Sequence, residues 1–440
     1  MKFCNREEEV LQLKNICNKA YTEHSRFTVV MGRRRIGKTS LILNAMKEEE
    51  CLIYLFVGRN NESELCFSFS SEISNKLKIF VPKIEKFGDL FLFLMERGRE
   101  QKFTLVIDEF QELGNINPSV FSDIQNHWDR NRAQSNINFI VSGSIYSLMT
   151  KIFTNNKEPL FGRADTIIKL NPFTTTVLKD IMNDYKSDYS NDELLALYVF
   201  TGGIPKYVEL LVDNGALSIN DMIAYVCQST SPFIDEGRNL LIGEFGKKYG
   251  NYFSILSAIA SGVNTQSEIE ARLGGLSLGG QLNKLENIYE LIRKRRPIFA
   301  KEGSQSVRYE ITDVFLKFWF RYIEKNRSLV EMGNYKGLAK IIKDDYNTYS
   351  GLQLEQYFKQ KFAESFDYRE ISSYWEAKGN QNEIDIVAIK LNKKDAVVVE
   401  VKRNMINFKP EHFAIKVEHI KTKHLSKYKI LSMCLSLEDM

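Results

Sequence analysis

Short runs of apolar residues recur over the first 170 residues of the chain, and stretches with helical periodicity separate several of them. The runs cover residues 27–31, 52–56, 103–107, 138–141 and 166–168. Strands that are buried on both faces are typically continuous apolar runs, and their alternation with helices indicates a parallel sheet. The pattern therefore predicts an α/β domain over residues 1–175, with a lead-in helix within residues 3–26.

The rest of the chain shows three further patterns. Residues 176–240 have helical periodicity and are predicted to form a helical lid. Residues 241–325 contain three helical segments followed by two short strands, the order of a winged helix, and then a linker rich in aromatic residues. Residues 326–440 combine a helix with apolar β runs at 383–389 and 396–402, which predicts a small α/β domain.

The segment between the first predicted strand and the next helix fits the phosphate-loop pattern G-x-x-x-x-G-K-[ST] without a mismatch. The segment and the residue after it are Gly32, Arg33, Arg34, Arg35, Ile36, Gly37, Lys38, Thr39 and Ser40. The glycines permit a tight turn, and the helix that follows directs N–H groups at phosphates. Lys38 is expected to reach the β- and γ-phosphates and Thr39 to bind Mg²⁺. The sequence therefore predicts a P-loop ATPase domain that binds ATP and Mg²⁺.

An acidic pair, Asp108 and Glu109, follows the third apolar run. The carboxyl end of a parallel strand lies at the edge where open α/β sheets bind ligands. We expect Asp108 to support the Mg²⁺ shell and Glu109 to orient or deprotonate the attacking water. Ser142 or Ser144, after the next strand, is a candidate γ-phosphate sensor, although small polar residues also end strands because of turn geometry.

Arg163 follows a tight turn just before the last predicted strand of this domain. An arginine there could stabilise transition-state charge, either in its own subunit or in a neighbour's site. A homo-oligomer or another protein partner is therefore compatible with the sequence. An ordinary surface arginine fits the spacing equally well.

The C-terminal segment carries chemistry of its own, with Asp385 on one predicted strand and Glu400 and Lys402 on the next. Glu400 and Lys402 alternate onto the same face of their strand. Carboxylates suit Mg²⁺, and the lysine could position a water against a phosphodiester. Glu355, on the preceding helix, could add a third carboxylate. The alternative is a hairpin with an exposed charged edge.

Charge alone does not identify a partner, because a net charge of +4 is too small to argue for nucleic acid. Two local clusters do favour DNA. Residues 293–296 are four consecutive basic residues, suited to phosphates. Residues 390–430 hold 11 Lys or Arg against 4 Asp or Glu, a local net of +7. A protein-contact module and a solvated basic surface remain the alternatives.

The expected compartment is the cytoplasm, with no membrane partner. The N-terminus lacks an apolar signal core, and no run approaches the roughly 18 apolar residues of a membrane span. The six cysteines are scattered without a C-x-x-C pair, which favours reduced thiols.

Taken together, the chain resembles the prokaryotic "archaeal-type" AAA ATPase family, close to the STAND-like branch of phosphate-loop ATPases. The motifs that carry the resemblance lie at residues 32–39, 106–111, 142–144, 160–163, 202–207, 309–322, 383–388 and 400–402. The resemblance implies a C-terminal domain similar to PD-(D/E)xK nucleases, and a nucleotide-sensing role for Arg163. Asn5 departs from the family pattern, because relatives usually have glycine there.

Two functions are compatible with this sequence. The first is an ATP-hydrolysing switch that acts on or is regulated by DNA, with Asp385, Glu400 and Lys402 cutting DNA in a metal-dependent reaction. The second is a non-catalytic regulatory or defence-type switch whose C-terminal domain only binds DNA or protein.

Overall fold

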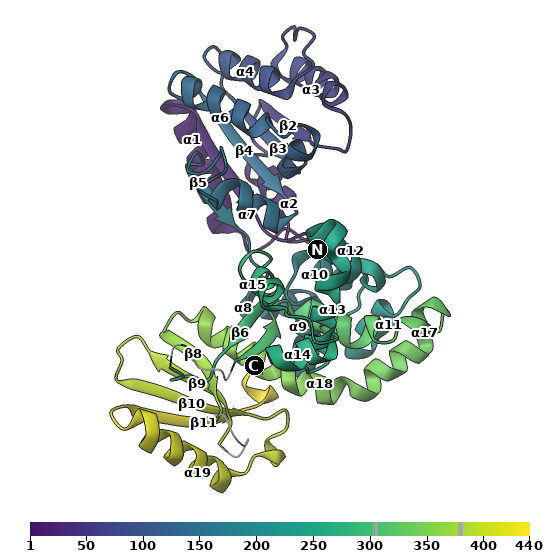
Figure 1. Cartoon of the computed structure of the whole chain (residues 1–440), viewed down its shortest axis with the longest axis vertical. Helices are drawn as coiled ribbons and strands as arrows, with labels where there is room; N and C mark the ends of the chain where they lie inside the picture. The colour runs from purple at the N-terminus through teal and green to yellow at the C-terminus, as the bar shows by residue number, and fades with distance from the viewer. Residues whose placement is uncertain (302, 304–306, 377–381) are drawn as a thin grey trace. The chain divides into compact units, whose positions relative to one another are not determined.

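The chain divides into two compact units, Lys2–Asn171 and Pro172–Met440, the latter together with Met1 (Figure 1). The computed structural model describes residues 1–301, 303, 307–376 and 382–440. The first unit holds the predicted ATPase domain. The second unit holds the segments predicted as a lid, a winged helix and a C-terminal domain.

One parallel five-stranded sheet forms the centre of the first unit, in the order β2-β3-β4-β1-β5. Its strands are β1 (Arg26–Met31), β2 (Leu52–Phe56), β3 (Phe103–Asp108), β4 (Ile137–Gly143) and β5 (Thr166–Lys169). The predicted parallel α/β fold is thereby confirmed. Because β4 lies between β1 and β3, the segments that leave these three strands meet at one edge of the sheet.

Helices cover both faces of this sheet because successive strand residues point to opposite sides. Val30 and Ile140 pack with side chains of α1 (Glu7–Thr22) and α2 (Lys38–Ala45). Phe27 and Phe139 point the other way and stack on each other, with ring centroids 4.4 Å apart. The helices on that second side are α3 (Glu62–Leu77), α4 (Phe87–Arg97), α5 (Leu113–Ile116), α6 (Val120–Asn131) and α7 (Tyr146–Thr154).

The second unit begins with a helical region built around α9 (Asn191–Thr201), which is buried along Leu194–Thr201. Such a helix, apolar all round, needs neighbours on every side. The other helices up to the first hairpin are α8 (Thr175–Tyr185), α10 (Pro205–Asp213), α11 (Ile219–Val226), α12 (Phe233–Phe245), α13 (Tyr249–Ala260), α14 (Gln266–Arg272) and α15 (Gly279–Asn287).

A two-stranded antiparallel hairpin, which we call the basic hairpin, follows α13–α15 in the predicted order. It consists of β6 (Ile292–Arg295) and β7 (Arg308–Ile311). The chain continues through α16 (Val314–Phe318), a π-helical segment η4 (Trp319–Glu324), α17 (Arg327–Glu331) and the long helix α18 (Tyr335–Glu364). Among the helices that the structure describes, none is both long enough and apolar enough to cross a lipid bilayer.

A separate four-stranded sheet closes the second unit, in the order β11-β10-β9-β8 (Figure 1). Its elements are β8 (Tyr368–Tyr374), β9 (Ile384–Lys390), β10 (Asp395–Val401), α19 (Pro410–Ile420) and β11 (Lys429–Leu435). The hairpin of β9 and β10 was predicted, whereas β8 and β11 were not. Val387 and Val398 pack with Phe413 and Ile420 of α19 in its core.

The two glycines of α12 provide a test of packing in the second unit. A Cβ on Gly237 would lie 2.2 Å from the indole ring of the fully buried Trp319, whereas a Cβ on Gly243 meets nothing within 4 Å. Gly237→Ala is therefore expected to lower the free energy of unfolding by about 1–3 kcal/mol. Gly243→Ala is the matched control and should be neutral or stabilising by up to about 1 kcal/mol, because alanine favours helix. Equal unfolding midpoints in urea for the two variants would contradict this packing.

Candidate functional site

The phosphate loop leaves the carboxyl end of β1 in a conformation that depends on its glycines. Gly37 has a φ of 89° and directly precedes α2, so an L side chain there would be strained. A Cβ on Gly32 would lie 3.0 Å from the carbonyl oxygen of Leu170. The Lys38 ammonium donates to the carbonyl oxygens of Gly32 and Arg33, at 2.9 Å each. The loop therefore holds a buried cation at the start of α2.

The Asp108 carboxylate ends β3 and accepts four hydrogen bonds. Its Oδ2 accepts from the Thr39 hydroxyl at 2.9 Å and the Tyr54 hydroxyl at 2.6 Å. Its Oδ1 accepts from the Ser142 hydroxyl at 2.5 Å and the Glu109 amide at 3.0 Å. Burial acts to raise the pKa of Asp108, but the hydrogen bonds outweigh it and hold that pKa below its usual value. The structure thus brings together Thr39 and Asp108, the pair expected to hold Mg²⁺.

Glu109 adopts a left-handed backbone conformation, with a φ of 55°. Its Oε2 accepts hydrogen bonds from the Gln111 side-chain amide at 2.6 Å and the Ser144 hydroxyl at 2.8 Å. The sequence could not choose between Ser142 and Ser144 as a sensor. In the structure each serine donates to a different carboxylate: Ser142 to Asp108 and Ser144 to Glu109.

Sequence reasoning missed Tyr54 and Gln111 as members of this site. Tyr54 lies in β2, within an apolar run of the sequence. Its hydroxyl is polar and needs a hydrogen-bond partner when buried, and Asp108 is that partner. Gln111 is buried, and a Cβ on Gly143 would lie 2.1 Å from its Oε1. Glycine at the end of β4 therefore leaves room for the Gln111 side chain.

The structure does not bring Arg163 to the phosphate loop of its own subunit. Arg163 precedes β5, which runs parallel to β1 with Thr166 paired to Thr28. It therefore lies toward the amino end of the sheet, whereas the loop follows the carboxyl end of β1. Its guanidinium pairs with Asp129 at 3.2 Å and donates to the Phe161 carbonyl at 2.9 Å. The sequence left open whether Arg163 acts in its own subunit or in a neighbour's site; the structure places it away from its own loop, and a nucleotide-sensing role stays a prediction.

Asn5 adopts a left-handed backbone conformation. Its φ is 52°, in the left-handed region that asparagine tolerates better than most residues. The following Arg6 donates to the Asn171 carbonyl at 2.6 Å. Asparagine therefore keeps a backbone conformation that glycine adopts without strain.

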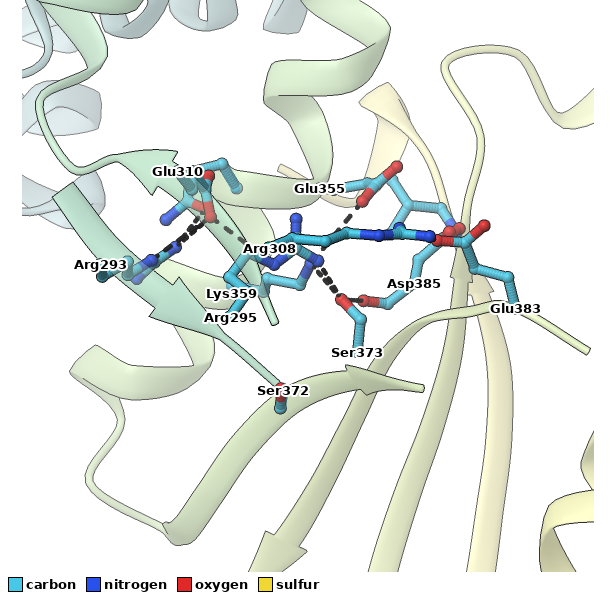
Figure 2. Close-up of polar contacts among 12 residues, drawn as sticks. Arg293, Arg295, Arg308, Glu310, Glu355, Lys359, Ser372, Ser373, Glu383 and Asp385 are labelled. Atoms are coloured by element: carbon cyan, nitrogen blue, oxygen red, sulfur yellow. Dashed lines mark hydrogen bonds and ion pairs between the residues drawn. The ribbon is translucent and has the colours of Figure 1, made fainter. Parts of the chain in front are cut away.

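The predicted carboxylates of the second unit come from α18, β9 and β10. The β9–β10 register pairs Ile386 with Val399, and one further step places Asp385 opposite Glu400 on the same face. Asp385 accepts from the Val401 amide at 2.7 Å. Glu355 lies close by on α18 (Figure 2). The structure thus assembles these side chains from three elements that lie apart in the sequence.

Burial sets the charge of this cluster. It raises the pKa of Glu355 to about 7, with a further rise from the nearby Asp385 charge, and it also raises the pKa of Asp385. Burial lowers the pKa of Lys359 to about 8. Glu355 and Asp385 are therefore driven toward their neutral forms.

Glu400 behaves differently because two lysines hold it. Its carboxylate pairs with Lys402 at 2.9 Å and Lys416 at 3.2 Å, and these pairs keep its pKa low in spite of burial. Among the residues that the structure describes, no three His, Cys, Asp or Glu side chains converge to hold a metal ion. Lysines hold Glu400 in this structure, and a metal site of Glu355, Asp385 and Glu400 stays a prediction.

The basic run at residues 293–296 is used largely within the chain (Figure 2). Ion pairs or hydrogen bonds join Arg293 to Glu310 at 3.2 Å, Lys294 to Glu286 at 2.7 Å and Arg295 to Ser373 at 2.6 Å. Ser373 also accepts from Lys359 at 2.8 Å and donates to the Asp385 carbonyl at 2.8 Å. The sequence left a DNA-binding and a protein-contact role open for this run; three of its four side chains bond within the second unit, and a DNA-binding role stays a prediction.

A phosphate loop on a parallel sheet, with a buried aspartate at the end of a neighbouring strand, defines a P-loop ATPase domain. Residues 3–211 match the family described as an ATPase domain predominantly from Archaea. The chain is 31% identical over 409 residues to an uncharacterized protein of Methanocaldococcus jannaschii, covering 91% of this chain and 87% of that protein. The chain therefore belongs to this family of archaeal-type ATPases. Residues 319–412 match a family of archaeal and bacterial proteins of unknown function.

Two solved structures match the chain. The Walker-type ATPase of Pyrococcus abyssi is 21% identical with a TM-score of 0.53, covering 72% of this chain and 96% of that chain. The ORC2 protein of Aeropyrum pernix, in ADPNP-ADP complexes, is 14% identical with a TM-score of 0.49. The match covers 75% of this chain and 95% of that chain. The first similarity shows a shared fold.

The raised pKa of Glu355 predicts how stability depends on pH. Folding raises this pKa from the ordinary 4.5 to about 7, so the folded chain binds more protons between those values and stability falls as pH rises through them. Glu355→Gln cannot ionise. Its free energy of unfolding, measured in urea, should fall less than that of the wild type between about pH 5 and pH 8, by on the order of 1–2 kcal/mol.

Glu370→Gln is the control for this prediction, because Glu370 is exposed on the neighbouring strand β8. It should keep the pH dependence of the wild type. A Glu355→Gln variant with the same pH dependence as the wild type would show that burial does not perturb this carboxylate.

Proposed function

We propose that the protein is an ATP-hydrolysing switch that acts on DNA or is regulated by it. The observation that supports ATP hydrolysis is the contact between the Asp108 carboxylate and the Thr39 hydroxyl, 2.9 Å long, at the edge of the sheet where the phosphate loop begins. A buried, charged aspartate beside a loop threonine suits the octahedral shell of Mg²⁺.

Each residue of the site has a role in this proposal. Lys38 binds the β- and γ-phosphates, while Thr39 and Asp108 hold Mg²⁺, which neutralises charge on the phosphate oxygens when bound. Glu109 orients the attacking water. Its carboxylate is held in place by Ser144 and Gln111, so that it is oriented before substrate arrives.

The phosphate loop also touches the segment that leads to the second unit. Leu170 donates its amide to the Met31 carbonyl at 2.8 Å and abuts Gly32 at the start of the loop. Asn171 is the last residue of the first unit. A change in the loop on hydrolysis would therefore reach the connection between the units directly, which is the basis for proposing a switch.

Replacing Lys38 tests the ATPase proposal. Lys38→Ala should lower ATP turnover by on the order of 100-fold or more, because it removes the cation that stabilises transferring charge. Glu109→Gln should keep ATP binding and lose turnover, because the amide cannot accept a proton from water. Turnover is measured by phosphate release and binding by titration with labelled ATP.

Lys47→Ala is the matched control, because Lys47 is an exposed lysine just beyond α2. It should hydrolyse ATP at the wild-type rate. Wild-type turnover in Lys38→Ala would show that the loop is not the site of hydrolysis.

Metal-dependent DNA cleavage by the C-terminal domain is a second candidate function. Two observations favour it: Glu355 and Asp385 lie together with raised pKa values, and Lys402 extends from the neighbouring strand. A divalent cation between two such carboxylates would favour their charged forms. It would also compete with Lys402 and Lys416 for Glu400.

A plasmid-nicking assay in Mg²⁺ or Mn²⁺ tests this function. Wild-type protein should nick DNA, and Asp385→Asn should reduce nicking by on the order of 100-fold or more, because it removes a metal ligand. Asp395→Asn, at the far end of the same hairpin, should nick as the wild type does. Salt-sensitive DNA binding without nicking in either metal would instead favour a non-catalytic switch, which the net charge of +7 over residues 390–430 supports.

A further inference from the structure

The four-stranded sheet of the second unit has two edge strands, β8 and β11, which differ in how they are covered (Figure 1). The chain that follows β6 lies along β8, where the Ile298 amide donates to the Ser373 carbonyl at 2.9 Å. Register shifts also interrupt the pairing of β8 with β9. Both features protect a sheet edge from pairing with another strand. β11 has neither, because it pairs with β10 in continuous register and with no other strand among the described residues.

The hydrogen bonds at the two ends of β11 show which of its backbone groups face outward. The Lys429 amide donates to the Lys394 carbonyl at 2.8 Å, and the Leu435 carbonyl accepts from the Lys402 amide at 2.9 Å. Lys429, Leu435 and every second residue between them therefore direct their backbone groups at β10. The residues that direct their N–H and C=O groups away from the sheet are Ile430, Ser432 and Cys434. Such a row of outward groups is a template for a further strand.

The side chains of β11 favour further pairing. Its sequence from Ile430 to Leu435 contains no proline and no charged residue, the residue types that usually prevent pairing at an edge. Ile430 packs toward the core beneath α19, so Leu431 and Met433 lie on the opposite face of the sheet. Leu431 is 55% exposed. A strand added beside β11 would therefore cover apolar surface as well as backbone groups.

The strand is complementary to a second copy of itself in the antiparallel direction. With Ser432 opposite Ser432 of the second copy, the outward backbone groups of these two residues bond to each other. Ile430 then bonds in the same way to Cys434 of the second copy. The same alignment places Leu431 opposite Met433 of the second copy in a non-hydrogen-bonded pair, where side chains lie closest. Backbone and apolar side chains are therefore matched by one alignment.

The charges at the two ends of β11 favour the same direction. Lys427 and Lys429 are exposed where the strand begins, and Glu438 and Asp439 are exposed just after it ends. Antiparallel alignment brings the basic end of one copy toward the acidic end of the other. Parallel alignment would instead bring like charges together, which is unfavourable.

We propose that the protein forms a two-fold symmetric dimer in which β11 of one copy pairs antiparallel with β11 of the other. Ser432 lies at the two-fold axis, and the two four-stranded sheets join into one continuous sheet. The contact is isologous, so it closes on itself and leaves neither β11 edge open. The association is independent of ATP hydrolysis and of DNA cleavage.

Sedimentation of the full chain over a series of concentrations tests the proposal. The wild type should show a reversible monomer–dimer equilibrium. Leu431→Lys should weaken the dimer by on the order of tenfold or more, because it places an ammonium group against an apolar side chain at two symmetric positions. Since Leu431 is exposed in the single chain, this variant should keep the unfolding midpoint of the wild-type monomer.

Leu276→Lys is the matched control, because Leu276 is 66% exposed in the connection between α14 and α15. It introduces the same charge at another exposed leucine of the second unit. It should dimerise with the wild-type affinity.

A cross-link tests the alignment itself. Opposite residues of a hydrogen-bonded antiparallel pair have Cα atoms about 5.5 Å apart, a separation that a disulfide spans. Ser432→Cys should therefore form a covalent dimer under mild oxidation, and a thiol reductant should reverse it. Ser229→Cys, at an exposed position before α12, and the wild type should remain uncross-linked under the same conditions.

Three results would overturn the proposal. A chain that sediments as a monomer up to its highest soluble concentration would exclude a second copy as the occupant of this edge, and would leave a strand of a different protein as the candidate. A dimer that Leu431→Lys leaves intact would place the interface elsewhere. A dimer in which Ser432→Cys does not cross-link would contradict the alignment about Ser432.

Discussion

The nucleotide site depends on one buried carboxylate, Asp108, that remains charged. Burial opposes that charge, and hydroxyls from α2, β2 and β4 offset the cost by donating to the two carboxylate oxygens. These donors come from Thr39, Tyr54 and Ser142. The same hydrogen bonds join β3 to two other strands and to the helix after the phosphate loop. Charge and position are therefore maintained by a single network, and loss of any donor would disturb both.

The carboxylates of the second unit illustrate the opposite balance. Glu355 and Asp385 are buried near each other, and burial pushes both toward the neutral form. Hydroxyl donors keep the Asp108 carboxylate charged before any cation binds. Glu355 and Asp385 ionise fully only when a cation or a change in packing stabilises their charged forms. The two acidic sites of the chain thus differ in the charge that their carboxylates carry in the absence of a cation.

Basic residues in the second unit have a structural role that a count of charges does not reveal. Glu310 on β7 pairs with Lys317 at 2.5 Å, Arg293 at 3.2 Å and Arg295 at 3.6 Å. Burial acts to raise the pKa of Glu310, but these three cations outweigh it and hold it well below its usual value. A run of like charge in the sequence became a set of internal ion pairs, because its neighbours in space are acids from other segments.

Much of the first unit was predictable because its signals are local. Apolar runs set the strands of the parallel sheet, and the glycine spacing at residues 32–37 set the loop. The pairing of Thr39 with Asp108 followed from a general property of parallel sheets, whose carboxyl ends meet at one edge. Tyr54 and Gln111 were missed because nothing in their own segments indicates a partner 54 residues away for Tyr54, or that Gly143 leaves space for the Gln111 side chain.

By itself, the sequence determined the phosphate loop, the acidic strand end and the five strands of the first unit, because each of these depends on residues close together in the chain. Only the tertiary structure decided that Arg163 faces Asp129, that lysines hold Glu400 and that Ser373 joins the basic hairpin to β9. These outcomes depend on which distant segments become neighbours. The charge that a side chain carries, and the partner that it finds, are properties of that packing and not of the local pattern.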